Sequence, residues 1–189
     1  NPKADGTEYD IYRDGLKIYT TIDSRMQQYA EEAVVQHLSN LQEQFFIEQA
    51  KNKTAPFNRI TEPEIDRIIE RSMKNSDRWK IMKQKGFSDE QIIASFSVKS
   101  PMRVFAWEKN FADGDFDLDK MQNYKDTIMS PLDSIRYHKH FLQTGLMSMD
   151  PTTGNVKAWV GGIDYKHFQY DHVGQGARQV GSTFKPFVY

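Results

Sequence analysis

Residues 145–162 read GLMSMDPTTGNVKAWVGG and carry the clearest structural signal in the chain. Two short runs rich in apolar residues, 146–149 and 156–160, flank the segment Asp-Pro-Thr-Thr-Gly. Proline sets φ for entry into a turn, and glycine adopts the left-handed backbone that the turn needs. The stretch therefore predicts an antiparallel β-hairpin whose second strand ends at the Gly161-Gly162 pair.

A polar loop leads from this hairpin to a Gly-Ser-Thr-Phe-Lys-Pro segment at positions 181–186, which contains the pattern Ser182-x-x-Lys185. Residues three apart on a helix lie on one face, about 5–6 Å apart at Cβ. A serine placed in this way can give its proton to a neutral lysine and attack a carbonyl carbon. The lysine needs a pKa lowered from about 10.4 towards 7, which burial, a nearby cation or a helix N-terminus can supply.

The same pattern is also typical of a serine that simply caps a helix. Serine and lysine are common residues, so about one Ser-x-x-Lys is expected by chance in a chain of this length. The spacing alone therefore leaves both interpretations of Ser182 and Lys185 open.

Two elements are expected near the beginning of the chain. Asp-Gly at positions 14–15 lies between β-favouring residues and predicts a hairpin turn, and the alternation over residues 16–22 predicts a strand. A long amphipathic helix should follow, because apolar residues recur at spacings of three and four from residue 26 to residue 45. Either Asp23 or Ser24 can act as its N-cap.

The middle of the chain changes period. Residues 61–96 should form three short helices, because each expected start has a capping residue before an apolar run. These caps are Thr61 with Glu64, Ser76, and Ser88 with Gln91. Apolar residues around 102–107 then predict a strand, and the pattern of residues 137–165 is β-like.

Two groups of potential metal ligands occur in this region. Four aspartates alternate in an acidic stretch: Asp113, Asp115, Asp117 and Asp119. A calcium loop beginning at Asp113 would need Gly at position six and Glu at position twelve, where the chain has Leu118 and Tyr124. We therefore expect a solvated acidic loop. His138-x-His140 would place two imidazoles on one face of a strand, as in a zinc site, but no third ligand follows at a recognisable spacing.

Composition narrows the classes of protein further. The 189 residues carry 25 Lys+Arg against 26 Asp+Glu, and this formal charge of -1 argues against nucleic acid as a partner. The absence of cysteine excludes disulfides, thiolate catalysis and cysteine-bound zinc. No apolar run approaches the ~20 residues that a membrane-spanning helix needs. The chain begins with Asn-Pro-Lys and has no signal segment, so we expect a piece of a longer protein.

Several motifs occur together at the end of the chain. They are the Asp-Pro-x-Thr-Gly hairpin, Val-Gly-Gly, and Arg-Gln-x-Gly-Ser-x-Phe-Lys-Pro-Phe, all within residues 145–189. In this order and spacing they resemble the start of the transpeptidase domain of class A penicillin-binding proteins. Residues 15–38, with GLKIYTTID followed by Gln27-Gln28 and Ala30-Glu-Glu-Ala33, are similar to the strand and helix that enter that domain. Residues 39–144 match no motif and look like an insertion.

The resemblance implies a specific reaction. By matching position, Ser182 would be the acylated nucleophile and Lys185 its base, acting on the D-Ala-D-Ala end of a peptidoglycan peptide stem. β-Lactams would trap Ser182. The family usually also has a membrane-anchored glycosyltransferase domain, which implies the periplasmic, extracytoplasmic face of the bacterial cytoplasmic membrane. The resemblance implies no metal and no organic cofactor.

The chain also departs from the family pattern. The Ser-x-Asn and Lys-Thr/Ser-Gly motifs that complete the active site are absent from it. We therefore expect the isolated fragment to be inactive. The alternative function is an accessory interaction module, in which residues 39–144 bind another envelope protein or the glycan and so position the enzyme.

These observations predict an α+β fold: a truncated transpeptidase start, made of an antiparallel hairpin plus helices, with a largely helical insertion. We expect four regions along the chain. They are a linker (1–14), a strand and long helix entering the domain (15–52), an accessory insertion (53–144, helical over 61–96, then β-rich with an acidic loop over 97–144), and the N-terminal part of the transpeptidase domain (145–189).

Overall fold

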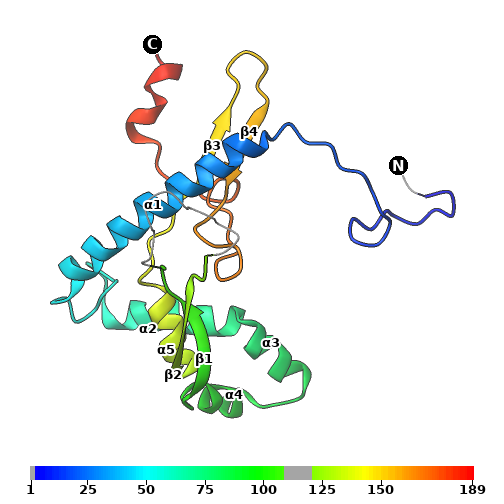
Figure 1. Cartoon of the computed structure of the whole chain (residues 1–189). Helices are drawn as coiled ribbons and strands as arrows, with labels where there is room; N and C mark the ends of the chain where they lie inside the picture. The colour runs from blue at the N-terminus through cyan, green and yellow to red at the C-terminus, as the bar shows by residue number, and fades with distance from the viewer. Residues whose placement is uncertain (1–2, 109–120) are drawn as a thin grey trace.

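The computed structural model describes residues 3–108 and 121–189, and its mixture of helices and antiparallel hairpins confirms the α+β class. The helices are α1 (Ser24–Gln49), α2 (Glu62–Asn75), α3 (Asp77–Gln84), α4 (Asp89–Phe96), α5 (Pro131–His138) and the 3-10 helix η2 (Gly181–Phe187). The strands are β1 (Ser100–Phe105), β2 (Tyr124–Met129), β3 (Leu146–Met149) and β4 (Val156–Val160). In Figure 1, α1 lies between the β3–β4 hairpin on one side and the β1–β2 hairpin with α2–α5 on the other.

Helix α1 begins where the sequence predicts. Asp23 is its N-cap, and its Oδ1 accepts hydrogen bonds from the backbone N–H groups of Arg25 (3.0 Å) and Met26 (3.2 Å). The apolar face of α1 is buried in the main core together with residues of β1, β4 and the segments that follow α5 and β4. This core consists of Ala30, Val34, Leu38, Phe105, Phe141, Ala158, Val160 and Ile163.

The β3–β4 hairpin has the predicted turn. Asp150 Oδ1 accepts hydrogen bonds from the backbone N–H groups of Thr152 (2.8 Å) and Thr153 (3.2 Å), and Gly154 has a φ of 73°. A left-handed backbone at that position favours glycine, because a Cβ would crowd the chain. The two strands are antiparallel, with Met147 opposite Trp159.

The three short helices also begin at their predicted caps. Thr61 and Ser88 each form a reciprocal capping box, with Glu64 and Gln91 respectively, and Ser76 Oγ accepts from the backbone N–H of Trp79. Helices this short need tertiary packing. They obtain it in a second core made of Met73, Trp79, Ile92 and Phe96, against which Met82, Leu132 and Ile135 pack.

Helix α5 joins the second core to the main one. Tyr137 donates its hydroxyl hydrogen to the carbonyl oxygen of Phe105 (2.8 Å), and the N–H of Phe105 donates to Nε2 of His138 (3.3 Å). Gln42 of α1 is 1% exposed, and its amide donates to the carbonyl oxygen of His140 and accepts from the N–H of Leu142. A buried amide with both groups paired fixes α1 against the end of α5.

Two predictions about strands are wrong. Residues 16–22 form no strand, and no hairpin is made at positions 14–15, where the chain instead turns between Asp10 and Asp14. Leu16, Ile18 and Tyr19 are exposed, and Figure 1 shows this segment extending away from the fold. Only its end reaches β4, where Thr21 donates to the carbonyl oxygen of Val156 (2.6 Å), so within the described residues no strand covers one face of the alternation.

The second wrong prediction concerns residues 137–165, which were expected to be β-like throughout. The first part is the end of α5 and a following turn, and β3 begins only at Leu146. The reason is local: Ser130 forms a capping box with Asp133, and Pro131 occupies the first helical turn. These helix signals precede a stretch of Ile, Tyr and His that otherwise resembles a strand.

Candidate active site

Ser182 and Lys185 lie in the short 3-10 helix η2 at the end of the chain. Gly181 immediately before Ser182 has a φ of 53°, which lets the backbone enter the helix abruptly. A 3-10 helix has three residues per turn, so side chains at i and i+3 stand on the same side. The structure therefore brings Ser182 and Lys185 to one side of one turn. Among the residues that the structure describes, no hydrogen bond joins them.

The surroundings of this turn are open. Every residue from 174 to 189 is exposed, including Phe184 (52%) and Phe187 (81%). In Figure 1, η2 stands apart from α1 and from both hairpins. A lysine acts as a base at neutral pH only in a buried or positively charged environment. The described residues do not provide that environment around Lys185.

In contrast, the part of the fold that precedes the turn is tightly hydrogen-bonded. We call this part, which consists of α1, the β3–β4 hairpin and the main core, the frame. The side-chain amide of Gln27 on α1 accepts the backbone N–H of Trp159 (2.8 Å) and donates to the carbonyl oxygen of the same residue (3.0 Å). A neighbouring β-strand would make the same two bonds to β4. Gln27 belongs to the family motif, but its partner 132 residues away was not predictable from local pattern.

A groove runs along the end of β4. Its volume is about 550 Å³, and it is lined by residues of α1, of β4 and of the segment after β4, among them Glu31, Val35, Trp159, Ile163, Tyr165 and Asp171. Ser182 and Lys185 do not line it. The groove therefore does not include the predicted nucleophile or its base.

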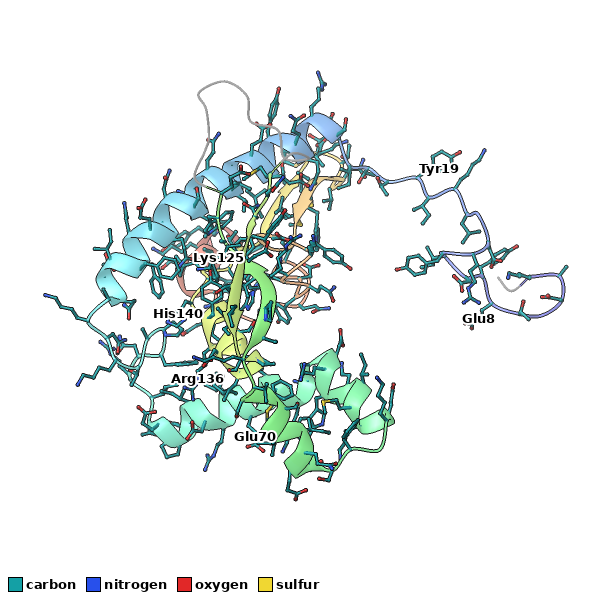
Figure 2. All side chains as sticks on the ribbon, turned by 60° about the horizontal axis from the view of Figure 1, so that its bottom comes forward. Glu8, Tyr19, Glu70, Lys125, Arg136 and His140 are labelled. Carbon is teal, nitrogen blue, oxygen red and sulfur yellow. The ribbon has the colours of Figure 1, made fainter. Side chains whose placement is uncertain are left out.

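His138 and His140, considered above as zinc ligands on one strand, instead lie at the end of helix α5 and just after it. Both imidazoles bond back to carbonyl oxygens of α5: His138 Nδ1 is 2.7 Å from that of Ser134, and Nδ1 of His140, just after the helix, is 3.0 Å from that of Arg136. Figure 2 shows His140 and Arg136 close together at this end of α5. Over residues 3–108 and 121–189, no three His, Cys, Asp or Glu side chains form a metal-binding group.

His138 is held in one neutral form. Its Nδ1–H donates to a backbone carbonyl, and its Nε2 accepts the N–H of Phe105. Burial lowers the pKa of His138 below its usual value, and neighbouring His167 adds to the effect. His138 is therefore a structural link between α5 and β1.

The acidic calcium candidate, residues 113–119, lies outside the described residues. Within the described ranges, no helix is both long enough and apolar enough to cross a membrane.

Comparisons with known proteins relate most of the chain to one group. The family model of the penicillin-binding protein middle domain matches residues 52–142. Penicillin-binding protein 1A of Neisseria flavescens is 28% identical over 95% of this chain and 23% of its own length. Penicillin-binding protein 1A of Neisseria lactamica is 52% identical, and penicillin-binding protein 2D of Bacillus subtilis is 48% identical. Each of these two matches covers 25% of this chain and 6% or 7% of the relative, respectively.

The chain thus spans about a quarter of the length of the Neisseria flavescens relative. No solved structure matches it.

Proposed function

We propose that this chain, as a member of the class A penicillin-binding proteins, carries the nucleophile of a peptidoglycan D,D-transpeptidase. Ser182 is the residue that becomes acylated, and Lys185 is its base. The observation that carries this proposal is the placement of both side chains on one side of a helical turn directly after Gly181.

The proposed reaction has two halves. Ser182 Oγ gives its proton to Lys185 Nζ and attacks the carbonyl carbon of a D-Ala-D-Ala peptide bond. That bond breaks, the proton passes to the nitrogen of the departing D-Ala, and an ester remains on Ser182. An amine of a neighbouring peptide stem then attacks the ester carbonyl, forms the cross-link and returns a hydroxyl to Ser182. A β-lactam acylates the same oxygen when its ring amide opens.

The isolated chain should not perform this reaction. It lacks the Ser-x-Asn and Lys-Thr/Ser-Gly motifs, and η2 is exposed on the described fold. The proposal therefore assigns the activity to the complete protein, in which the missing motifs pack against η2. For that protein we also propose a glycosyltransferase domain, a membrane anchor, a location on the extracytoplasmic face, and no metal or organic cofactor.

The test is acylation by a fluorescent penicillin, followed on a denaturing gel. In the complete protein, a labelled band should form, and Ser182→Ala should abolish it. The isolated chain should remain unlabelled at micromolar drug for minutes. A band that persists in Ser182→Ala would assign the nucleophile to another residue and overturn the proposal.

A second candidate function rests on the middle of the chain. Helices α2–α4 have their own small core, yet Ile81, Phe87 and Ile93 are each between 41% and 49% exposed. A contiguous apolar patch is typical of a contact surface, and we infer that these three side chains belong to one. They favour an accessory module that binds an envelope protein and positions the enzyme. Replacing all three residues by serine should leave penicillin acylation intact and reduce binding of that protein.

A further inference from the structure

One carboxylate fixes the loop that leads from β4 towards Ser182. Asp171 Oδ1 accepts the backbone N–H groups of Val173 (2.9 Å) and Gly174 (3.1 Å), and its Oδ2 accepts the indole N–H of Trp159 (3.2 Å). The bond from Gly174 is the main reason that the pKa of Asp171 lies below its usual value. Asp171 therefore stays ionised and ties the loop to β4.

The chain also leaves too little room for a side chain at two glycines, one at the end of β4 and one within the loop. The N–H of His172 donates to the carbonyl oxygen of Gly161 (2.7 Å). A Cβ on Gly161 would lie 2.8 Å from Asp171 Oδ1, and a Cβ on Gly176 would lie 2.5 Å from the carbonyl oxygen of His172. Such contacts are shorter than packed atoms tolerate. The glycines thus allow the loop to close around the Asp171 carboxylate.

This loop contains the last partly buried residues before the turn that carries Ser182 and Lys185. Residues 171–173 are partly buried, whereas all residues from 174 onwards are exposed. The path of the backbone to Ser182 therefore starts from the place where Asp171 holds it. A displacement at that place would shift the start of the segment 174–181 that leads to Ser182. Misplacement of a reacting group by 1 Å can cost about a hundredfold in rate.

We propose that Asp171 is a positioning residue for the acylation of Ser182: it holds Trp159 and the 173–174 amides together and so sets where the Ser182 turn begins. This inference rests on the proposed function. It goes beyond that function because it assigns a role to a residue that touches neither the nucleophile nor its base.

The experiment uses the complete protein and follows labelling by a fluorescent penicillin in time. The final amplitude reports the folded, reactive fraction, and the first-order rate constant at saturating drug reports the geometry of the site. Asp171→Ala should lower that rate constant at least tenfold, with an unchanged concentration of half-saturation. Asp171→Asn, which keeps one acceptor oxygen, should recover part of the rate.

Two further variants sharpen the result. Asp150→Ala is the matched control, because Asp150 makes the same kind of carboxylate-to-amide bonds at the tip of the β3–β4 hairpin. It should leave the rate constant unchanged. Trp159→Phe removes the indole donor together with part of the ring, and the double variant with Asp171→Ala should lose less than the sum of the two losses, since the two residues share one hydrogen bond.

Each outcome decides between the alternatives. If Asp171→Ala lowers the amplitude but not the rate constant, Asp171 is merely structural and this inference is wrong. If Asp150→Ala slows the reaction equally, the effect is a general one of the hairpin and the inference is again wrong. If the unmutated protein is labelled but Ser182→Ala is labelled as well, the proposed function itself fails, and this inference fails with it.

Discussion

The joint between α1 and β4 and the turn that carries Ser182 belong to the same predicted domain, yet they are held in different ways. At the joint, Gln27 and the N–H of Asp23 pair with backbone groups of β4, and the apolar face of α1 packs with β4 in the main core. At the turn, Ser182, Lys185 and the phenylalanines beside them are exposed. The difference indicates that the frame is held by its own contacts, whereas we expect the turn to need a packing partner before Ser182 becomes reactive.

The largest expected effect is on reactivity and should leave the frame untouched. In the complete protein, Ser182→Ala should abolish penicillin acylation and Lys185→Ala should nearly abolish it, because a serine without its base is a poor nucleophile. In the isolated chain, neither substitution should move the thermal unfolding midpoint. A large loss of stability in either variant would show that the turn is part of the frame after all.

The second-largest expected effect is on the free energy of unfolding of the frame. Phe105→Ala should destabilise the isolated chain by about 3–5 kcal/mol, because Phe105 is fully buried and meets the rings of Trp107, Phe141 and Phe168. The matched control is Phe187→Ala in the exposed turn, which should change stability by no more than about 0.5 kcal/mol. Denaturant titration of the two variants measures both. Equal losses would remove the distinction between frame and turn.

A smaller effect tests the Gln27 joint directly. Gln27→Ala should cost about 1–3 kcal/mol, because it removes two hydrogen bonds to Trp159. Gln28→Ala is its neighbouring control, since Gln28 is exposed and its amide donates to Glu32 on the same helix. Denaturant midpoints for the pair should differ clearly. If they coincide, the Gln27 bonds contribute nothing net to the joint.

The smallest effect is pH-dependent. Burial lowers the pKa of His138, so the unfolded chain takes up the proton first as the pH falls below about 6.5. This contribution to stability is therefore present above that pH and is lost below it, with a slope of at most about 1.4 kcal/mol per pH unit.

His138→Gln supplies the comparison, because an amide can still donate to Ser134 and accept from Phe105 without titrating. Unfolding midpoints between pH 8 and pH 5 should fall more steeply for the natural chain than for the variant. His167 stacks on His138 and contacts Asp164 in both proteins. An equal or steeper fall in the variant would show that His138 is not the source of the pH sensitivity.

Much of the fold was predictable because its signals are local. Caps such as Thr61, Ser76 and Ser88 satisfy backbone groups within three residues, so the sequence alone locates the helix starts. The strand at 16–22 failed because a strand needs a neighbour, which no local pattern reveals. The start of α5 was missed although Ser130 and Asp133 carry the same cap signature, because the β-like residues after them dominated the pattern.

In the candidate site too, the features that local pattern determines were predictable and the long-range contacts were not. The spacing of Ser182 and Lys185 is a local pattern, and the structure places both on one helical turn. The residues that fix the route to that turn act across the fold. Gln27 reaches Trp159 from 132 positions away, and Asp171 reaches it from 12. Only the folded chain shows that both bonds converge on the same tryptophan.

The Gln27 amide also decides on which side this small sheet is able to grow. Because it occupies both backbone groups of Trp159, β4 offers an incoming strand no free pair at that residue. Met147 lies opposite Trp159 in the β3–β4 pair. Because the backbone groups of Trp159 point away from β3, those of Met147 point away from β4, towards the outer edge of β3. They have no partner within the described ranges. Any strand added by the rest of the protein should therefore dock along β3, and a proline at Met147 should block that docking while sparing the hairpin itself.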